Sequence, residues 1–352
     1  MKDITRLGQT VLSGVRRIYG CASYALSVDG KTLASGAAGS LGPDGGGRAG
    51  TETLYDLASI TKIFTAILAM QFIERGELKL TTKAVEVLGR KAGEQIAGVT
   101  VHELLSHISG LAPLRNSMKR CSSRDNVFGV LNRSERSGAG RGVYSDLGYM
   151  LLGEILEEIS GRNQDWLMRN MILSRTRTTL PVYSPLPASK CAPTGYSSIR
   201  RRELRGEPHN EVTAKMEGVS GHAGLFSTSS DLIKIGHILL GDLLEEKGRL
   251  LTASSLRRMT TPVSTVLDSQ RYGLGLMISP GAITSAVPGV RKLFGHTGHT
   301  GTSIFIDTKW KSVSVLLTNR DQVNGDLKEM QRTRVAFHTQ ALEEAKRISM
   351  HG

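Results

Sequence analysis

The stretch that decides the fold is LASITKIFTAILAMQFIERG, residues 57–76. It predicts a helix from Ser59 to about Arg75, ended by Gly76. This helix is apolar on nearly every side, which is typical of a helix buried within a larger core. Serine is a favoured first residue of a helix, and Lys62 stands three residues later on the same face. We therefore expect the lysine to reach back to the Ser59 hydroxyl in a rigid setting.

The Ser59–Lys62 pair has the residue types that nucleophilic catalysis requires. A helix dipole contributes about 1 kcal/mol, whereas one pKa unit corresponds to about 1.4 kcal/mol, so the dipole alone cannot activate a hydroxyl. A positioned base is needed, and a lysine with a lowered pKa is one candidate. The alternative is a capping serine beside a solvent-facing lysine, because Ser-x-x-Lys also occurs by chance.

Two later segments carry polar residues beside predicted elements. Tyr144-Ser145-Asp146 stands at the start of a predicted helix over 145–160, and Gly295-His296-Thr297-Gly298 follows a short predicted strand. The order Ser-x-x-Lys, Tyr-x-Asp, His-Thr-Gly resembles the serine β-lactamase and penicillin-binding-protein superfamily. The tyrosine of the second element makes the chain most similar to the class C β-lactamases, D-alanyl-D-alanine carboxypeptidases and family VIII-type esterases.

Two further segments carry the same resemblance. Residues 104–111, LLSHISGL, resemble the "LLxHxSGL" segment of the superfamily, and residues 218–228, GVSGHAGLFST, resemble its "AGGLxST" segment. The resemblance thus runs from about residue 20 to about residue 345. It implies an α+β, β-lactamase/transpeptidase-like fold, in which an antiparallel sheet is flanked by N- and C-terminal helices and a helical lobe is inserted.

The residue pattern gives the same order of elements, with strands near both ends and helices between them. The predicted elements are a helix over 3–18, a hairpin of 22–28 with a strand to about 37, helices over 101–107, 145–160, 163–171, 229–242 and 252–259, strands near 272–278, 291–295, 302–307 and 312–318, and a helix over 325–347. We expect residues 1–57 and 262–352 to form a discontinuous α/β lobe. Residues 58–261 would form a mainly helical lobe, with the active-site cleft between the lobes. The irregular stretch 176–218 is either a mobile lid or a packed wall of that cleft.

The resemblance implies a role for each catalytic residue. Ser59 would be the nucleophile that forms an acyl-enzyme. Lys62 and Tyr144 would share its proton, with Tyr144 as the acceptor because nearby cations lower its pKa. His296 would occupy the position of the third-motif lysine.

The resemblance also implies how substrate is held. The backbone N–H groups of Ser59 and His299 would form the oxyanion hole, in which one donor is worth about 3 kcal/mol. Asp146, Thr297 and Gly298 would contact substrate, with Gly298 leaving the strand edge bare.

Two departures from the superfamily pattern bear on the substrate. Many relatives have lysine where this chain has His296, and asparagine where it has Asp146. A histidine with a pKa of about 6.5 is mostly neutral at pH 7, and an ionised Asp146 would repel the carboxylate of a β-lactam or D-Ala peptide. We therefore expect hydrolysis of small esters or amides, with carboxypeptidase or β-lactamase activity as the alternative. Arg200–Arg202 could supply a substitute anion site.

The composition bounds the remaining possibilities. The chain has 352 residues, 39% hydrophobic and 22% charged, which is typical of a globular protein and excludes a disordered or collagen-like chain. An alternative from another functional class is a non-catalytic protein, either a penicillin sensor or a module that binds an anionic polymer. The net charge of +13 supports the second of these. Aromatic residues are only 5%, so no nucleic acid is expected as a partner. The sequence leaves the oligomeric state open.

No cofactor or metal is expected. His102 and His107 are five residues apart and would diverge around a helix, so His107 is better read as bracing the helical lobe. Cys21, Cys121 and Cys191 are an odd, widely spaced set that favours reduced thiols. Because the N-terminus lacks an apolar signal region and no stretch could span a membrane, we expect a cytoplasmic protein unless a leader was removed.

Overall fold

The computed structural model describes residues 2–42, 47–113, 123–138, 140–266, 270–290 and 292–351. Its largest sheet is antiparallel and has eight strands in the order β2-β1-β13-β12-β11-β10-β9-β8. These strands are β1 (Cys21–Val28), β2 (Lys31–Gly39), β8 (Ser264–Val266), β9 (Gln270–Tyr272), β10 (Met277–Ile278), β11 (Leu293–Thr297), β12 (Ser303–Asp307) and β13 (Ser312–Thr318). Strands from both ends of the chain therefore meet where β1 pairs with β13.

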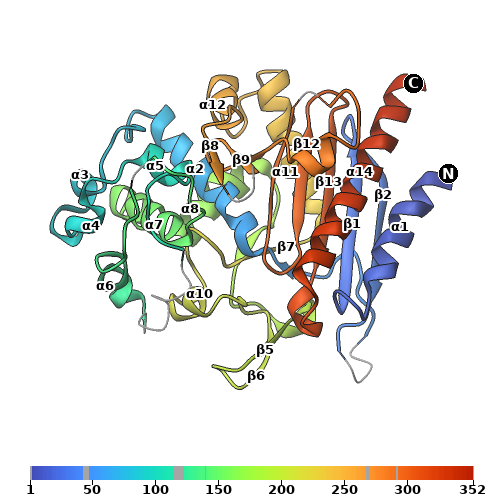
Figure 1. The fold of residues 1–352 in the computed structure, drawn as a ribbon, viewed down its shortest axis with the longest axis horizontal. Helices are drawn as coiled ribbons and strands as arrows, with labels where there is room; N and C mark the ends of the chain where they lie inside the picture. Colours follow the sequence, from blue (N-terminus) through green and yellow to red (C-terminus); the bar gives the residue numbers. More distant parts are fainter. Residues whose placement is uncertain are drawn as a thin grey trace.

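Helices cover both faces of this sheet. Figure 1 shows α1 (Lys2–Gly14) and α14 (Leu327–His351) side by side along one face. The opposite face packs on α11 (Ser229–Leu244), which contacts β1 and β13. Side chains alternate along a strand, so Val313 and Val315 join the core on the α11 face while Leu316 joins the core beneath α14.

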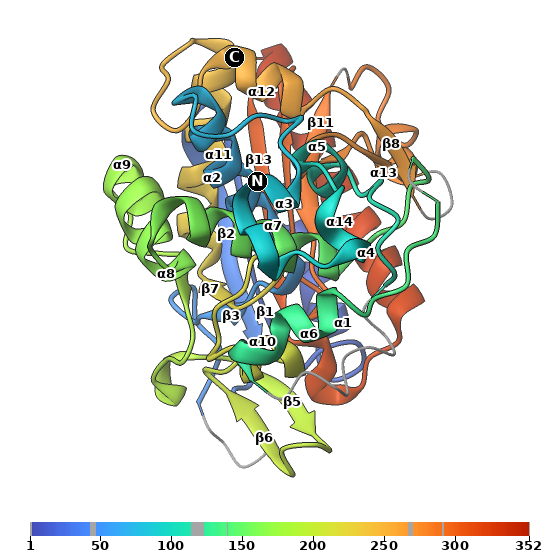
Figure 2. The ribbon, with the colours of Figure 1, turned by 90° about the vertical axis from the view of Figure 1, so that its left-hand side faces the viewer.

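The other helices lie mostly on the far side of the molecule from the termini (Figures 1 and 2). They are α2 (Thr61–Glu74), α3 (Ala84–Leu88), α4 (Glu94–Ala97), α5 (Val101–Leu105), α6 (Val127–Leu131), α7 (Asp146–Ser160), α8 (Gln164–Leu167), α9 (Ser174–Thr176), α10 (Glu211–Lys215), α12 (Ala253–Met259) and α13 (Gly281–Thr284). Every residue of α2 from Thr61 to Phe72 is buried, as the apolar pattern predicts.

Two small sheets complete the fold. One has the order β3-β7-β4, with β3 (Tyr55–Asp56), β7 (Leu225–Ser227) and β4 (Val182–Tyr183). The other is the hairpin of β5 (Pro193–Ser197) and β6 (Arg202–Arg205), which projects at the lower edge in Figure 2. The stretch 176–218 thus contains β4, β5, β6 and α10, and β5 packs on the turn Arg320–Val323.

The predicted α+β arrangement is confirmed, because an antiparallel sheet is flanked by the N- and C-terminal helices. Some boundaries were wrong. The helix expected over 3–18 ends at Gly14, and the one expected over 163–171 becomes a π-helix at Met168–Leu173. Since α11 lies within 58–261 and yet packs on the large sheet, the division into two lobes stays a prediction.

Two further expectations can be followed in the described residues. Cys21 and Cys191 are buried free thiols, whereas Cys121 lies outside the described residues. In the part of the chain that the structure describes, no helix combines the length and apolar character needed to cross a membrane.

Candidate active site

Ser59 lies in a short 3-10 turn, Ala58–Ile60, directly before α2. The expectation that Ser59 opens the helix as its cap was wrong, because the cap position of α2 is Ile60 and no side chain caps it. The hydroxyl instead accepts a hydrogen bond from Lys62 Nζ at 2.9 Å, as the three-residue spacing predicted. Ala58 and Ile60 are buried, while Ser59 keeps partial exposure. The turn therefore presents Ser59 rather than its neighbours.

The backbone before Ser59 is held by hydrogen bonds from three elements. The Asp56 side chain accepts one from the Ala58 N–H at 2.8 Å, and the Leu57 N–H donates to Leu225 O in β7 at 2.9 Å. In addition, the Thr302 hydroxyl donates to Leu57 O at 3.0 Å. The large sheet and the small sheet thus both fix the turn that carries the candidate nucleophile.

Lys62 is fully buried, and its ammonium group has three acceptors. Nζ lies 2.9 Å from Ser59 Oγ, 2.6 Å from Asp146 Oδ1 and 3.2 Å from His222 O. Burial lowers the pKa of Lys62, and the charge of Asp146 opposes that shift only in part. Burial is the largest single influence on the pKa of Asp146 and raises it, but the charge of Lys62, the hydrogen bond from its ammonium group and contributions from nearby histidines together outweigh burial and lower that pKa to about 2. Asp146 is therefore ionised at neutral pH.

Tyr144 precedes α7, and its phenol lies near enough to Ser59 for the serine side chain to act on its pKa. The expectation that nearby cations lower its pKa was wrong. Burial raises the pKa of Tyr144 well above its usual range, and the negative charge of Asp146 adds to this, while Ser59 opposes it. The cation 5.0 Å from the Tyr144 ring centroid is Lys62, whose charge Asp146 neutralises at 2.6 Å. Tyr144 is therefore a neutral phenol in this site.

His296 lies in β11, buried, with its ring centroid 6.1 Å from that of Tyr144. Nδ1 donates a hydrogen bond to Thr297 O at 2.7 Å, so Nε2 is the unprotonated nitrogen of the neutral ring. Burial, followed by the charge of Lys62, lowers the pKa of His296 to about 3. The position of the third-motif lysine therefore carries no charge at neutral pH.

Gly298 follows β11 and packs tightly against the nucleophile turn. A Cβ at this position would lie 2.2 Å from Thr302 Oγ1 and 2.5 Å from Leu57 O. The glycine is needed for this close approach, which differs from the expectation that it leaves a strand edge bare for substrate. Thr297, at the end of β11, is partly buried.

The His299 backbone, expected in the oxyanion hole, is braced by an arginine. Arg320 Nε donates to His299 O at 3.1 Å, and Arg320 Nη2 donates to His299 Nε2 at 2.9 Å. Arg334, which is buried, donates to Gly298 O and to Gly301 O. Two guanidinium groups thus hold the turn that follows β11.

A group of potential metal ligands lies beside this turn, with one of its members, His299, in the turn itself. His209, His299 and Asp321 each offer one ligand atom, and these atoms lie within 4.8 Å of one another. However, Arg320 Nη2 contacts both His299 Nε2 and the Asp321 carboxylate. A guanidinium therefore already supplies the cation of this cluster, and we assign no metal to it.

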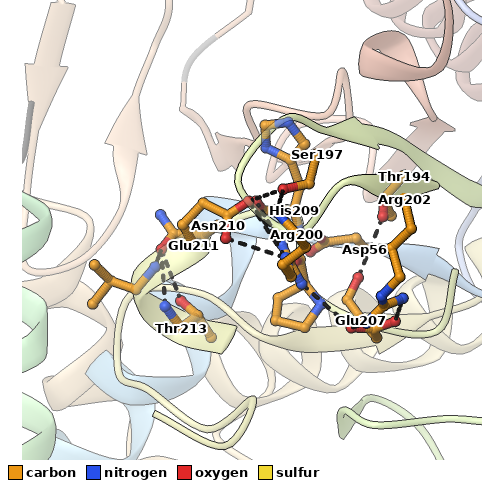
Figure 3. A network of polar contacts seen from close by, with 12 residues as sticks. Asp56, Thr194, Ser197, Arg200, Arg202, Glu207, His209, Asn210, Glu211 and Thr213 are labelled. Carbon is orange, nitrogen blue, oxygen red and sulfur yellow. Dashed lines mark hydrogen bonds and ion pairs between the residues drawn. The ribbon is translucent and has the colours of Figure 1, made fainter. Parts of the chain in front are cut away.

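Two of the three arginines expected to offer a substitute anion site, Arg200 and Arg202, are engaged with carboxylates instead. Arg200 pairs with Glu207 at 3.4 Å and with Glu211 at 3.1 Å, and Arg202 also pairs with Glu207. Figure 3 shows this network, in which the His209 N–H also donates to the Asp56 side chain at 2.8 Å. The network therefore ties the β5–β6 hairpin to the segment before Ser59.

Two further histidines lie against the candidate catalytic residues. His222 braces the site, because its ring contacts the hydroxyls of Ser220 at 2.8 Å and Thr213 at 3.2 Å, and its carbonyl holds Lys62. His107 was expected to brace the helical lobe, yet its ring stacks on Tyr144. The segment LLSHISGL pointed to His107, but no pattern in the sequence could show which ring it meets.

Fold and site together define a penicillin-binding-protein-like serine hydrolase. The chain belongs to the Beta-lactamase family, whose model matches residues 14–338.

Proteins similar to this chain are named for several different activities. An N-acetylmuramyl-L-alanine amidase of Bacillus subtilis is 29% identical over 309 residues, which cover 77% of this chain and 68% of that protein. A putative D-alanyl-D-alanine carboxypeptidase of Salmonella paratyphi A is 27% identical over 308 residues, covering 78% and 71%. The solved structure of EstCE1, a hydrolase with promiscuous acyltransferase activity, superposes with a TM-score of 0.79 at 16% identity, covering 97% and 98%.

Proposed function

We propose that this chain hydrolyses small esters or amides through an acyl-enzyme on Ser59. The observation that carries the proposal is that Lys62 and Tyr144 both lie beside the Ser59 hydroxyl. Lys62 Nζ lies 2.9 Å from Ser59 Oγ, and the Tyr144 phenol is near enough to the same side chain for Ser59 to act on the pKa of the tyrosine. A nucleophile with a base and an acid in contact has the parts that acyl transfer needs. The relatives named as an amidase and a putative carboxypeptidase support a reaction of this class.

The proton balance of acylation follows from the two pKa shifts. Lys62 in its uncharged form, favoured by burial, takes the Ser59 proton as Oγ attacks the acyl carbonyl. Tyr144 is a neutral phenol and gives its proton to the leaving group. The Lys62 ammonium then returns a proton to Tyr144 through solvent. The roles differ from those implied by the resemblance, in which Tyr144 accepts the serine proton.

Deacylation reverses these steps with water in place of the leaving group. Water attacks the ester carbonyl and loses its proton to the uncharged Lys62, and the Lys62 ammonium then gives that proton to the Ser59 oxygen, which leaves as the hydroxyl. The backbone N–H groups of Ser59 and His299 would receive the oxyanion in both half-reactions. The double bracing of the turn after β11 supports this placement, because oxyanion donors act best when they are preorganised.

The charges around Ser59 support a preference for substrates without a carboxylate next to the scissile bond. Asp146 is ionised with 22% of its side chain exposed, while His296 is neutral. An anionic substrate would meet the Asp146 carboxylate where relatives of the superfamily offer an asparagine, and the neutral His296 ring where they offer a lysine. The second candidate is D-alanyl-D-alanine carboxypeptidase or β-lactamase action, which the name of the Salmonella relative favours.

The test is the mass of the intact protein after incubation with benzylpenicillin and, separately, with a p-nitrophenyl ester. Ser59→Ala is the control. Ester turnover without a penicillin adduct supports the ester or amide reading, and a Ser59-dependent penicillin adduct supports the second candidate. A penicillin adduct without any turnover would equally fit a penicillin sensor. Neither turnover nor adduct in the wild type would leave the reading as a polymer-binding module.

A further inference from the structure

His107 contacts the residues on both sides of Tyr144 as well as the tyrosine ring. Its imidazole stacks on Tyr144 with centroids 4.5 Å apart and an angle of 28° between the rings. Its Nδ1 accepts a hydrogen bond from the Ser145 N–H at 3.3 Å, and its carbonyl accepts one from the Val143 N–H at 2.8 Å. One buried histidine therefore holds the ring and both flanking peptide groups of the candidate acid.

His107 keeps this position at a conformational cost. Its φ is +57°, in the left-handed region that residues other than glycine rarely adopt. Because Nδ1 accepts a bond, the proton of the neutral ring sits on Nε2, and this buried N–H has no hydrogen-bond partner among the described residues. Unfavourable features of this kind persist where the surroundings over-determine them, and they concentrate at functional sites.

The His107 ring also has to stay uncharged to accept the hydrogen bond from the Ser145 N–H. Protonation of Nδ1 would remove the acceptor for the Ser145 N–H and place a second cation near Lys62. Burial, then the charges of Lys62 and His296, keep the pKa of His107 well below its usual range, although Asp146 opposes them. The acceptor on Nδ1 is therefore present throughout the pH range in which the enzyme would work.

We propose that His107 is a positioning residue that orients the Tyr144 phenol toward Ser59 and the leaving group. The inference rests on the proposed function, because it concerns how the acid of that reaction is held. His107 does not itself touch substrate in this account. It acts through Tyr144, by the ring stack and by the two hydrogen bonds to the backbone around it.

This role makes a specific kinetic prediction. A p-nitrophenolate leaves without a proton, whereas the alkoxide of an ethyl ester needs one from Tyr144. Misplacing Tyr144 should therefore slow an ethyl ester much more than a p-nitrophenyl ester of the same acid. A defect in folding would lower both rates by the same factor, since it removes active enzyme without regard to the leaving group.

Two variants separate the contacts of His107. His107→Phe keeps a ring to stack and loses the Nδ1 acceptor. His107→Asn keeps a side-chain oxygen that can accept from the Ser145 N–H, and asparagine tolerates positive φ better than most residues. The asparagine variant also provides a readout if the phenylalanine variant does not fold.

The experiment measures kcat and KM for both esters in wild type, His107→Phe, His107→Asn, Tyr144→Phe and the double variant His107→Phe/Tyr144→Phe. We expect His107→Phe to lower kcat for the ethyl ester about tenfold or more and kcat for the p-nitrophenyl ester by less than about threefold, with KM little changed. We expect His107→Asn to show the same selective loss, but a smaller one. In the Tyr144→Phe background the His107 change should cost less than about threefold, because the group that it positions is already gone.

Equal loss for both esters in both His107 variants, or losses that multiply in the double variant, would overturn the role of His107. Failure of the proposed function looks different. In that case the wild type itself would show no turnover that depends on Ser59, and the role of His107 would fall with it.

Discussion

Two groups of residues around Ser59 keep their charge states in opposite ways. Lys62 and Asp146 are both ionisable and stay paired at 2.6 Å, with the remaining contacts of the lysine satisfied by Ser59 and a backbone carbonyl. His107 and His296 are neutral instead, and each has a buried Nε2 without a partner among the described residues. Lys62 and Asp146 therefore control the proton by charge pairing, whereas the two histidines act only through the position of their neutral rings.

The largest effect should follow from breaking the charged group. Lys62→Met should lower kcat/KM by about a thousandfold or more, since it removes the base and leaves Asp146 unpaired. The free energy of unfolding should fall by less than about 3–5 kcal/mol, which is the loss typical of a broken buried ion pair, because Asp146 keeps 22% of its side chain exposed. Urea unfolding and ester kinetics measure the two effects.

A matched double variant separates stability from catalysis in this group. Lys62→Met/Asp146→Asn removes both charges, so it should recover much of the stability and none of the activity. Recovery of activity in the double variant would show that the lysine is not the base.

Acid should act on the buried neutral histidines around the site, which include His222 as well as His296. Burial lowers the pKa of His222 to about 4 and that of His296 to about 3, both below the unfolded value of about 6.5. As pH falls below about 6.5 the unfolded chain takes up these protons before the folded one does, so stability is lost. Each histidine contributes up to about 1.4 kcal/mol per pH unit between its two pKa values. Urea midpoints that stay constant from pH 7.5 to pH 5 would contradict the assignment of buried neutral rings.

A smaller effect should come from Asp146→Asn, which keeps an acceptor for Lys62 and removes the negative charge. The pKa of Lys62 should fall further, because the carboxylate no longer stabilises its ammonium form. The rising limb of the pH–kcat/KM profile should therefore move to lower pH by about one unit or more. A limb that stays in place, or moves to higher pH, would argue against Lys62 as the base. The same variant should acylate faster with benzylpenicillin, since the repulsion of its carboxylate is reduced.

The smallest effect is expected at Arg202, which lies outside both groups. Its guanidinium is paired with Glu207 on the exposed β5–β6 hairpin. Arg202→Ala should leave ester kinetics and penicillin labelling unchanged within error. A marked loss of penicillin labelling in this variant would revive the hypothesis of a substitute anion site on the hairpin.

The sequence predicted the parts of this site that depend on local pattern. The apolar run after Ser59 predicted a buried helix, and the three-residue spacing predicted the contact of Lys62 with the serine. It also led to the fold class through the order of the motifs. The placement of Ser59 in a 3-10 turn was missed, because the turn depends on bonds to residues far along the chain, such as Thr302.

Charge states were the least predictable feature. The pKa of Tyr144 was expected to fall because a lysine lies nearby, yet burial and Asp146 raise it. The order of the motifs shows which residues meet. It does not show how deeply each side chain is buried, or how far the charge of Asp146 offsets the charge of Lys62. The stack of His107 on Tyr144 could not be predicted either, because tertiary packing brings together two residues that lie 37 positions apart.

The most direct test of the central claim is to trap the acyl-enzyme. The protein is mixed with a p-nitrophenyl ester, quenched in acid within the first turnover, digested and mapped by mass spectrometry, with Ser59→Ala treated in parallel. The account predicts one acyl group on the peptide that contains Ser59 and none in the variant. An acyl group on another residue, or ester turnover that survives in Ser59→Ala, would contradict it.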